Sequence, residues 1–404
     1  MQSIQTNPTF TRRTLLLGVV GTVAHLTGCG GGGSDVAGLS SGGTGSFTSG
    51  TISGLGSIIV NGIRYNNDSA TVVSRDDGTT FGQPLKVGMV VSIQGSSVTP
   101  ATTTNGTATA TATKISCGSE WQGPVSSVGA SSFTMLGLTV DVLASTVFED
   151  EDGGNATQLT GLTTSHFVEV HGYVDQTTGH LQATHVEAST TPPTQYKLSG
   201  VVNNFSAVNQ TFKLGTTAQP SSQISWDSNT SVPTSWSDGV FVRVTMTPGL
   251  LATHIRLLTS PLALLGSDNE HDVEIHGFIS AYQSNADFTV NGIQVDASNA
   301  RIAGGTLALG VRVEIHGSIT NSVLIATKVE TPSNIDEASR TFEFHGTVSA
   351  WDATAQTFVL HGLTFKYSNS TSIQGVTLAN GVSIEVKATR SSGAWMATEI
   401  RSDD

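Results

Sequence analysis

The chain repeats itself, and this repetition limits its possible folds more than any other feature. The tetrapeptide Ala-Thr-x-Ile/Val recurs at five evenly spaced places in the 404 residues. Its copies are spaced by 71, 69, 74 and 71 residues, and they begin at Ala112, Ala183, Ala252, Ala326 and Ala397. A regular period is typical of a chain in which one structural unit is built several times. The sequence therefore predicts five copies of one small domain.

Two further landmarks keep the same order within the units. The first is a six-residue phrase with an apolar or aromatic residue at position 1, an apolar residue at position 3, glycine at position 5 and an apolar residue at position 6. It occupies residues 58–63, 133–138, 288–293 and 358–363, with a weaker version at 212–215. The second is a glycine followed by alternating apolar residues, at 88–93, 239–244, 310–315 and 381–386. The second unit has Ser165 where this glycine falls. Three landmarks in one order exclude a chance similarity.

Within a unit, the residue pattern is typical of β structure. Apolar and polar residues alternate through 311–316, which places the two kinds on opposite faces of a strand. His361-Gly362 predicts the tight turn of a hairpin between 357–360 and 363–367, because glycine readily adopts positive φ. Ala326 and Val329 are three residues apart, so a β-bulge is expected between them if both point inward. Leucine and lysine are scarce while Thr, Ser, Val and Gly are abundant, which disfavours helical bundles.

We therefore expect an all-β protein of five tandem small antiparallel β-barrels, similar in size to oligonucleotide-binding (OB) or SH3 barrels. Closing a short sheet into a barrel removes the exposed edges that it would otherwise present. The predicted barrels are residues 48–117, 118–191, 194–260, 268–333 and 339–404. They follow a signal peptide at 1–28 and a Gly/Ser-rich tether, expected to be disordered, at 29–47.

The N-terminal residues predict export and lipid attachment. Arg12 and Arg13 precede a short apolar run, which ends in Leu26-Thr27-Gly28-Cys29. This tetrapeptide resembles the lipobox of bacterial lipoproteins, and the resemblance implies that Cys29 is acylated and anchors the chain to a lipid bilayer. Gly30 stands where such proteins carry an aspartate when they stay in the inner membrane, which implies the outer membrane of a Gram-negative cell. The Sec and twin-arginine routes both remain open.

Charge and cysteine content exclude several classes of function. The formal net charge of −13 disfavours nucleic-acid partners, because binding to phosphates depends on Lys and Arg. If Cys29 is acylated, Cys117 is the remaining cysteine, so no disulfide within the chain is expected and the thiol is interpreted as inert. No nucleophile, base and orienting group can be assembled from the sequence, which predicts a protein that is not an enzyme.

The repeated landmarks resemble a bacterial family described as domain of unknown function 5666, whose short β domains recur in envelope lipoproteins. The resemblance covers residues 48–404 and is clearest at 288–293, 310–317 and 326–329. The third unit departs most, with residues 245–247 in place of the usual glycine end and Trp226 and Trp236 in its insert. The resemblance implies the fold and an envelope location, and it brings no activity or catalytic residues.

Two pairs of side chains form a candidate metal site in the fourth unit. Glu274 and His276 share one face of a strand, and Glu314 and His316 share one face of another. If the strands are neighbours, two imidazoles and two carboxylates gather as nitrogen and oxygen ligands for a divalent metal. The alternative is a solvent-facing set of positions that tolerates many residues. In other units the same positions hold Gln94, Gln122, Ser199 and Lys387.

Two weaker candidates complete the list of possible sites. Asp150 and Asp152 lie in the acidic run 149–155 and suggest a calcium loop, although EF-hand spacing is absent and a solvated turn is the alternative. The five tryptophans suggest stacking platforms for sugar rings, or else plugs at the barrel ends. The leading hypothesis is a non-enzymatic envelope lipoprotein without a cofactor, which binds or spaces another envelope protein. The alternative is a divalent-metal- or polysaccharide-binding lipoprotein.

Overall fold

The computed structural model describes residues 45–102, 106–258, 260–331 and 341–403, and these residues are almost entirely β structure. The predicted signal peptide, Cys29 and most of the predicted tether lie outside the described residues. The first strand begins at Ser46, inside the range assigned to the tether, and Phe47 is fully buried. Phe47 packs with core residues of the fourth repeat, which explains why an ordered strand begins so early.

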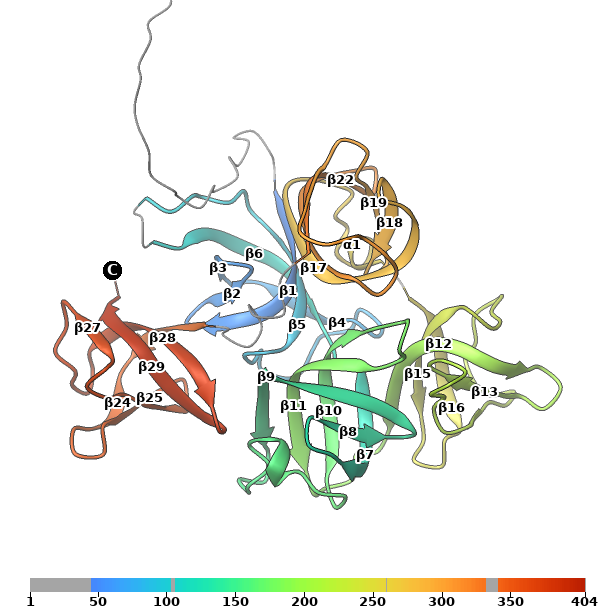
Figure 1. Ribbon diagram of the computed structural model, residues 1–404, viewed down its shortest axis with the longest axis horizontal. Helices are drawn as coiled ribbons and strands as arrows, with labels where there is room; N and C mark the ends of the chain where they lie inside the picture. The colour runs from blue at the N-terminus through green and yellow to red at the C-terminus, as the bar shows by residue number, and fades with distance from the viewer. Residues whose placement is uncertain (1–44, 103–105, 259, 332–340, 404) are drawn as a thin grey trace, which may run out of the picture. The chain divides into compact units, whose positions relative to one another are not determined.

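The fourth repeat shows the design of the barrel. Its strands are β17 (Asn269–Ser284), β18 (Asp287–Val290), β19 (Ile293–Asp296), β20 (Arg301–Ala303), β21 (Arg312–Thr320) and β22 (Val323–Glu330). β17 pairs with β18, β18 with β19, β19 with β22, β22 with β21, and β21 with β17 again. The sheet therefore closes on itself, and Figure 1 shows this orange barrel end-on.

The other four repeats use the same order of strands. The first contains β1 (Ser46–Leu55), β2 (Ile58–Val60), β3 (Ile63–Asn66), β4 (Thr71–Ser74), β5 (Val90–Gly95) and β6 (Ala108–Cys117). The second contains β7 (Trp121–Val128), β8 (Ser132–Met135), β9 (Leu138–Asp150), the 3-10 helix η1 (Leu159–Gly161), β10 (Phe167–Val174) and β11 (Leu181–Ser189). The third contains β12 (Tyr196–Ser206), β13 (Thr211–Leu214), β14 (Ile224–Ser225), β15 (Phe241–Met246) and β16 (Ala252–Leu257). The fifth contains β23 (Phe342–Thr347), β24 (Ser349–Asp352), β25 (Thr357–Leu360), β26 (Leu363–Lys366), β27 (Ser372–Gln374), β28 (Ser383–Ser391) and β29 (Ala394–Ser402).

The expectation of small closed barrels is confirmed, and each ring also contains parallel contacts that a purely antiparallel barrel would lack. The third strand of the ring runs parallel to the last one, as in β3–β6, β9–β11, β19–β22 and β26–β29. In the third repeat this contact is reduced to an isolated parallel bridge between Ser225 and Leu251. In the fourth repeat, for example, β22 pairs with β19 on one side and with β21 on the other. The last strand therefore closes the barrel without leaving a free edge.

The glycine landmarks are explained by one contact across the barrel. Asn291 and Gly292 form a two-residue turn with φ of 50° and 79°, a conformation that Asn-Gly adopts easily. The Asn291 amide nitrogen then donates to the carbonyl oxygen of His276 at 3.0 Å. A Cβ on Gly277 would collide with this amide, so the first strand needs a glycine at that point. Asn61 makes the same contact with Ser49, and His361 makes it with His345.

The Ala-Thr landmark marks a β-bulge in every repeat. The register between the last two strands of each repeat shifts at this point, which confirms the bulge expected between Ala326 and Val329. The threonine hydroxyl donates to a carbonyl oxygen on the facing strand, at 2.9–3.2 Å; the five pairs are Thr113–Gln94, Thr184–His171, Thr253–Thr245, Thr327–His316 and Thr398–Lys387. The motif therefore encodes a bulge and the side chain that stabilises it.

We expect Thr327→Val to destabilise the fourth barrel by about 0.5–1 kcal/mol, because the His316 carbonyl loses its hydroxyl donor while the β-branch is kept. Thr327→Ser keeps the donor and is expected to remain near the wild type. Hydrogen-exchange mass spectrometry of β21 and β22 measures the difference in protection. Equal protection in the two variants would contradict this role for the hydroxyl.

One short helix lies between the third and fourth repeats, in the stretch that the predicted barrel ranges leave unassigned. Helix α1 (Pro261–Leu265) begins with the Ser260 hydroxyl accepting from the amide of Leu262 and ends at Gly266, whose φ is 76°. Leu262 and Leu265 are buried in the core cluster of the fourth repeat. Within the described ranges, no helix has the length and hydropathy that a membrane-spanning helix requires.

Candidate metal centre

The structure brings the four predicted metal ligands together on one face of the fourth barrel. β17 and β21 are antiparallel neighbours, and their register places Glu274 opposite His316 and His276 opposite Glu314. The intervening residues Ile275 and Ile315 point the other way and are fully buried. Alternation of apolar and polar residues therefore positions the four polar side chains, which we call the fourth-barrel quartet.

The fourth-barrel quartet forms a ring in which imidazoles and carboxylates alternate. His276 Nε2 lies 3.1 Å from Glu274 Oε1 and 3.5 Å from Glu314 Oε2. His316 Nε2 lies 2.9 Å from Glu314 Oε1, and its Nδ1 lies 3.8 Å from Glu274 Oε2. The side chains are 16–29% exposed, so solvent and small ions reach them.

Electrostatic contacts within the ring shift the acid–base behaviour of two members. The hydrogen bond to Glu314 raises the pKa of His316 above its usual value, and burial opposes this only in part. The same hydrogen bond lowers the pKa of Glu314. Glu314 is therefore a carboxylate that attracts positive charge, which is the property required of a cation ligand.

The fifth barrel has a related cluster that contains its own cation. Glu343, His345 and Glu385 occupy the positions equivalent to Glu274, His276 and Glu314, and His345 Nε2 lies 2.8 Å from Glu343 Oε1. Arg401 donates to both oxygens of Glu385, at 2.7 and 2.5 Å. Burial lowers the pKa of His345, but the hydrogen bonds to Glu343 and Asp403 raise it overall.

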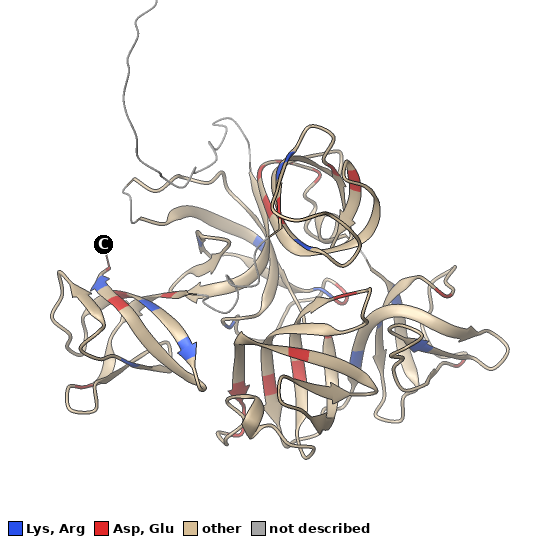
Figure 2. Ribbon diagram, viewed as in Figure 1, with Lys and Arg blue, Asp and Glu red and all other residues tan. Residues whose placement is uncertain are grey.

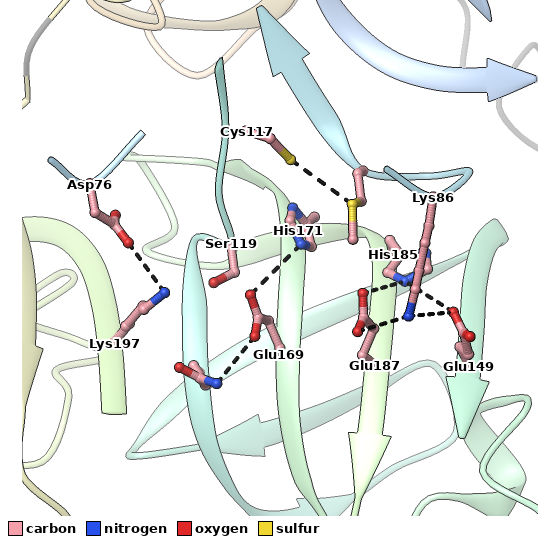
Figure 3. A network of polar contacts seen from close by, with 12 residues as sticks. Asp76, Lys86, Cys117, Ser119, Glu149, Glu169, His171, His185, Glu187 and Lys197 are labelled. Atoms are coloured by element: carbon pink, nitrogen blue, oxygen red, sulfur yellow. Dashed lines mark hydrogen bonds and ion pairs between the residues drawn. The ribbon is translucent and has the colours of Figure 1, made fainter. Parts of the chain in front are cut away.

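A third cluster of acids and histidine, in the second barrel, is neutralised by a lysine. Figure 3 shows Lys86 between Glu149 and Glu187, with His185 beside them. Lys86 Nζ lies 3.0 Å from Glu149 and 3.1 Å from Glu187, and His185 Nε2 lies 3.2 Å from Glu187. Among the described residues, the clusters with metal-like ligand spacing are this one and those of the fourth and fifth barrels.

The two aspartates of the predicted calcium loop stabilise the chain around them. Asp150 accepts from the backbone amides of Asp152 and Ala156, at 3.1 and 2.8 Å. Asp152 accepts from the amide and hydroxyl of Thr190, at 2.6 and 2.7 Å. Burial raises the pKa of Asp150, but these hydrogen bonds lower it overall, and the contacts with Thr190 lower the pKa of Asp152. Aspartates commonly accept such hydrogen bonds in turns.

Sequence reasoning missed a buried ion-pair network that involves the first three repeats. Arg243 lies in β15 and donates to Glu120 at 2.9 Å and to Asp76 at 2.7 Å. Lys197 also pairs with Asp76, at 3.2 Å, as Figure 3 shows. Burial raises the pKa of Asp76, but Arg243 and Lys197 lower it overall to about 2. A possible signal was the arginine at the position where the fourth and fifth repeats carry Glu314 and Glu385.

Cys117 and two of the candidate tryptophans contribute to the packing of the barrels. The Cys117 thiol is fully buried, and burial raises its pKa to about 12, in agreement with an inert thiol. Trp226 and Trp236 pack with Phe205 and Phe212 in one aromatic cluster, which is the arrangement expected of a barrel plug. Lysine and arginine are scattered over the strands in Figure 2.

Comparison with known proteins assigns a family to the chain. The family described as domain of unknown function (DUF5666) matches residues 47–115, 122–187, 276–330 and 345–401, more than half of the chain. No curated protein sequence matches it. A solved structure titled "drosophila Unr CSD456" is 12% identical with a TM-score of 0.13, covering 52% of this chain and 98% of its own. The third repeat falls outside the family matches but has the same ring of strands. The chain belongs to the DUF5666 family, and it carries that domain in four matched tandem copies.

Proposed function

We propose that this protein is a lipid-anchored lipoprotein of the bacterial envelope, in which the barrels serve as a non-enzymatic module that binds or spaces another envelope protein. The anchor would be acylated Cys29, and the location would be the outer membrane. The signal-like start and the Leu26-Thr27-Gly28-Cys29 tetrapeptide support the anchor. Several acyl chains, each contributing about 0.8 kcal/mol per buried methylene, would hold the chain on a bilayer.

One observation carries the proposal of a binding module. The barrel is preserved from repeat to repeat, while the residue before the glycine of the first strand varies; it is serine at Ser49 and Ser199, glutamine at Gln122, and histidine at His276 and His345. The bulge and the buried hairpin residues are kept under these different faces. A constant scaffold with variable faces supports recognition by several surfaces more than it supports catalysis at one site.

The ion pairs of the described residues also support a non-enzymatic module. Arg243 is engaged by Glu120 and Asp76, and Lys86 is engaged by Glu149 and Glu187. These side chains neutralise one another and hold neighbouring segments together. The second candidate function is binding of a divalent metal or a polysaccharide. The fourth-barrel quartet favours the metal within this alternative.

We expect Cys29→Ser to release the protein from the membrane, because the serine cannot form the thioether that carries the lipid. In a Gram-negative host supplied with labelled palmitate, wild-type protein should take up the label and fractionate with the outer membrane. The variant should be unlabelled and remain in the soluble periplasmic fraction. The matched control is Cys117→Ser, which should keep both the label and the membrane location. Label on the Cys29→Ser chain would refute the proposed anchor.

Partner capture tests the binding module separately from the anchor. The full wild-type chain, extracted in detergent after cross-linking in cells, should retain one envelope protein in stoichiometric amount. The Cys29→Ser chain serves as the control for capture that arises only from a shared membrane. Failure of the wild-type chain to retain any partner would count against the spacing or binding role and in favour of a small ligand.

A further inference from the structure

We propose that Glu274, His276, Glu314 and His316 form a binding site for one Zn²⁺ ion. The four side chains offer two imidazole nitrogens and two carboxylates, a ligand set suited to zinc. They come from two neighbouring strands of one barrel, so the site does not depend on contacts between repeats. The inference gives the binding module a ligand of stated chemistry, and it stands or falls independently of lipid attachment.

The nitrogen–oxygen contacts within the quartet are close to the spacing of ligand atoms around tetrahedral zinc. With metal–ligand bonds of about 2.0–2.2 Å, neighbouring ligand atoms of a tetrahedron lie about 3.4 Å apart. The four nitrogen–oxygen distances around the ring are 2.9, 3.1, 3.5 and 3.8 Å, and they involve both oxygens of each carboxylate and both ring nitrogens of His316. Glu274, Glu314 and His316 each present a ligand atom within 4.8 Å of the others. His276 is not part of this group of three, so its imidazole must reorient before all four side chains can surround one ion.

Comparison with the other two clusters indicates why the fourth barrel would take an external cation. In the second barrel, Lys86 lies between Glu149 and Glu187. In the fifth barrel, Arg401 binds both oxygens of Glu385. The position equivalent to Arg401 holds Glu330 in the fourth barrel, and Lys328 pairs with that glutamate at 2.8 Å. In the part of the chain that is described, the ion pairs of Glu274 and Glu314 are with histidines.

The backbone of both histidines is held in place by family landmarks. The carbonyl oxygen of His276 accepts from the amide of Asn291, which lies in the hairpin turn. The carbonyl oxygen of His316 accepts from the hydroxyl of Thr327, which lies at the bulge. Each imidazole therefore projects from a strand position fixed by a second hydrogen bond, and such pre-organisation favours metal binding.

Isothermal titration of the full chain in detergent with ZnCl₂ tests the site. Wild-type protein should show one zinc ion bound per chain, and His276→Gln/His316→Gln should bind at least about 100-fold more weakly, because loss of a supporting contact already costs 10–100-fold. His254→Gln is the matched control, since His254 is an exposed histidine in the third repeat, and it should bind as the wild type does. Circular dichroism checks that the variants are folded.

Cobalt provides a readout that needs no variant. Co²⁺ bound to wild-type protein should give the intense visible absorption of a four-coordinate site, and added Zn²⁺ should abolish it. Absence of zinc binding, equal zinc binding by the wild type and the double variant, or a purely octahedral cobalt spectrum would each overturn the proposal. Calcium binding of equal strength that is unaffected by the histidine substitutions would also overturn it, because calcium prefers oxygen ligands.

Discussion

Arg243→Met is expected to destabilise the third repeat by about 3–5 kcal/mol, the cost typical of removing one partner from a buried ion pair. Arg243 is almost buried, and it binds Glu120 at 2.9 Å, Asp76 at 2.7 Å and the carbonyl oxygen of Ser119 at 2.7 Å. Methionine fills part of the volume but leaves the two carboxylates without this cation. Glu120 is only 6% exposed, so water cannot replace the lost contact fully.

Hydrogen-exchange mass spectrometry is the suitable measurement, because a chain of several barrels does not unfold in one step. Amides of β12 and β15 should lose about two to three orders of magnitude of protection, since 1.4 kcal/mol corresponds to a factor of ten. Lys197→Met is the matched control: it removes a more exposed partner of the same Asp76 and should cost about 1 kcal/mol or less. Similar losses in both variants would show that burial of Arg243 does not decide the effect.

Acidification from pH 7 to pH 5 is expected to destabilise the second barrel by about 2 kcal/mol through His171 alone. His171 is fully buried, and neither ring nitrogen has a hydrogen-bond partner among the described residues. Burial, and to a smaller extent nearby His185, lowers the pKa of His171 from 6.5 to about 3. The closest carboxylate is Glu169, at 4.0 Å, and it does not compensate for the loss of water.

The sign follows from the protons bound in each state. Between pH 6.5 and pH 3 the unfolded chain protonates this histidine and the folded chain does not, so stability falls as the pH falls. His171→Leu should match or exceed the wild type at pH 7, and its loss between pH 7 and pH 5 should be about 2 kcal/mol smaller.

Urea titrations at the two pH values, read by hydrogen exchange in β10 and β11, measure the pH effect. His254→Leu is the control, because His254 is exposed and lies in another repeat. An unchanged pH dependence in His171→Leu would mean that His171 is protonated in the folded barrel.

Local features of the barrel were predictable because they depend on residues close together in the chain. Alternation of apolar residues places Val313 and Ile315 in the core and Glu314 on the outer face. Asn291-Gly292 specifies its turn through positive φ, and the three-residue spacing of Ala326 and Val329 specifies a bulge. The sequence alone could place Glu274 with His276 on one strand and Glu314 with His316 on another. It predicted a common site only on the condition that the two strands are neighbours, and β17 and β21 are neighbours.

Contacts between distant residues were not predictable in the same way. The parallel pairing of β19 with β22 depends on the path of the chain across the barrel end, which no local pattern encodes. Arg243 is more than a hundred residues from both Glu120 and Asp76 in the sequence, and only packing between repeats brings them together. The acidic run around Asp150 has the composition of a cation site, yet its carboxylates accept from nearby amides.

The sequence alone thus determined the repeat and its strand pattern, because backbone conformation and the alternation of faces are local properties. The chemistry of each outer face emerged only on folding, because it depends on which charges come within a few ångströms of one another. In the second and fifth barrels Lys86 and Arg401 meet the acids, while in the fourth barrel the carboxylates of Glu274 and Glu314 meet histidines. Coulomb interactions and desolvation act through space, so distance in the sequence does not reveal them.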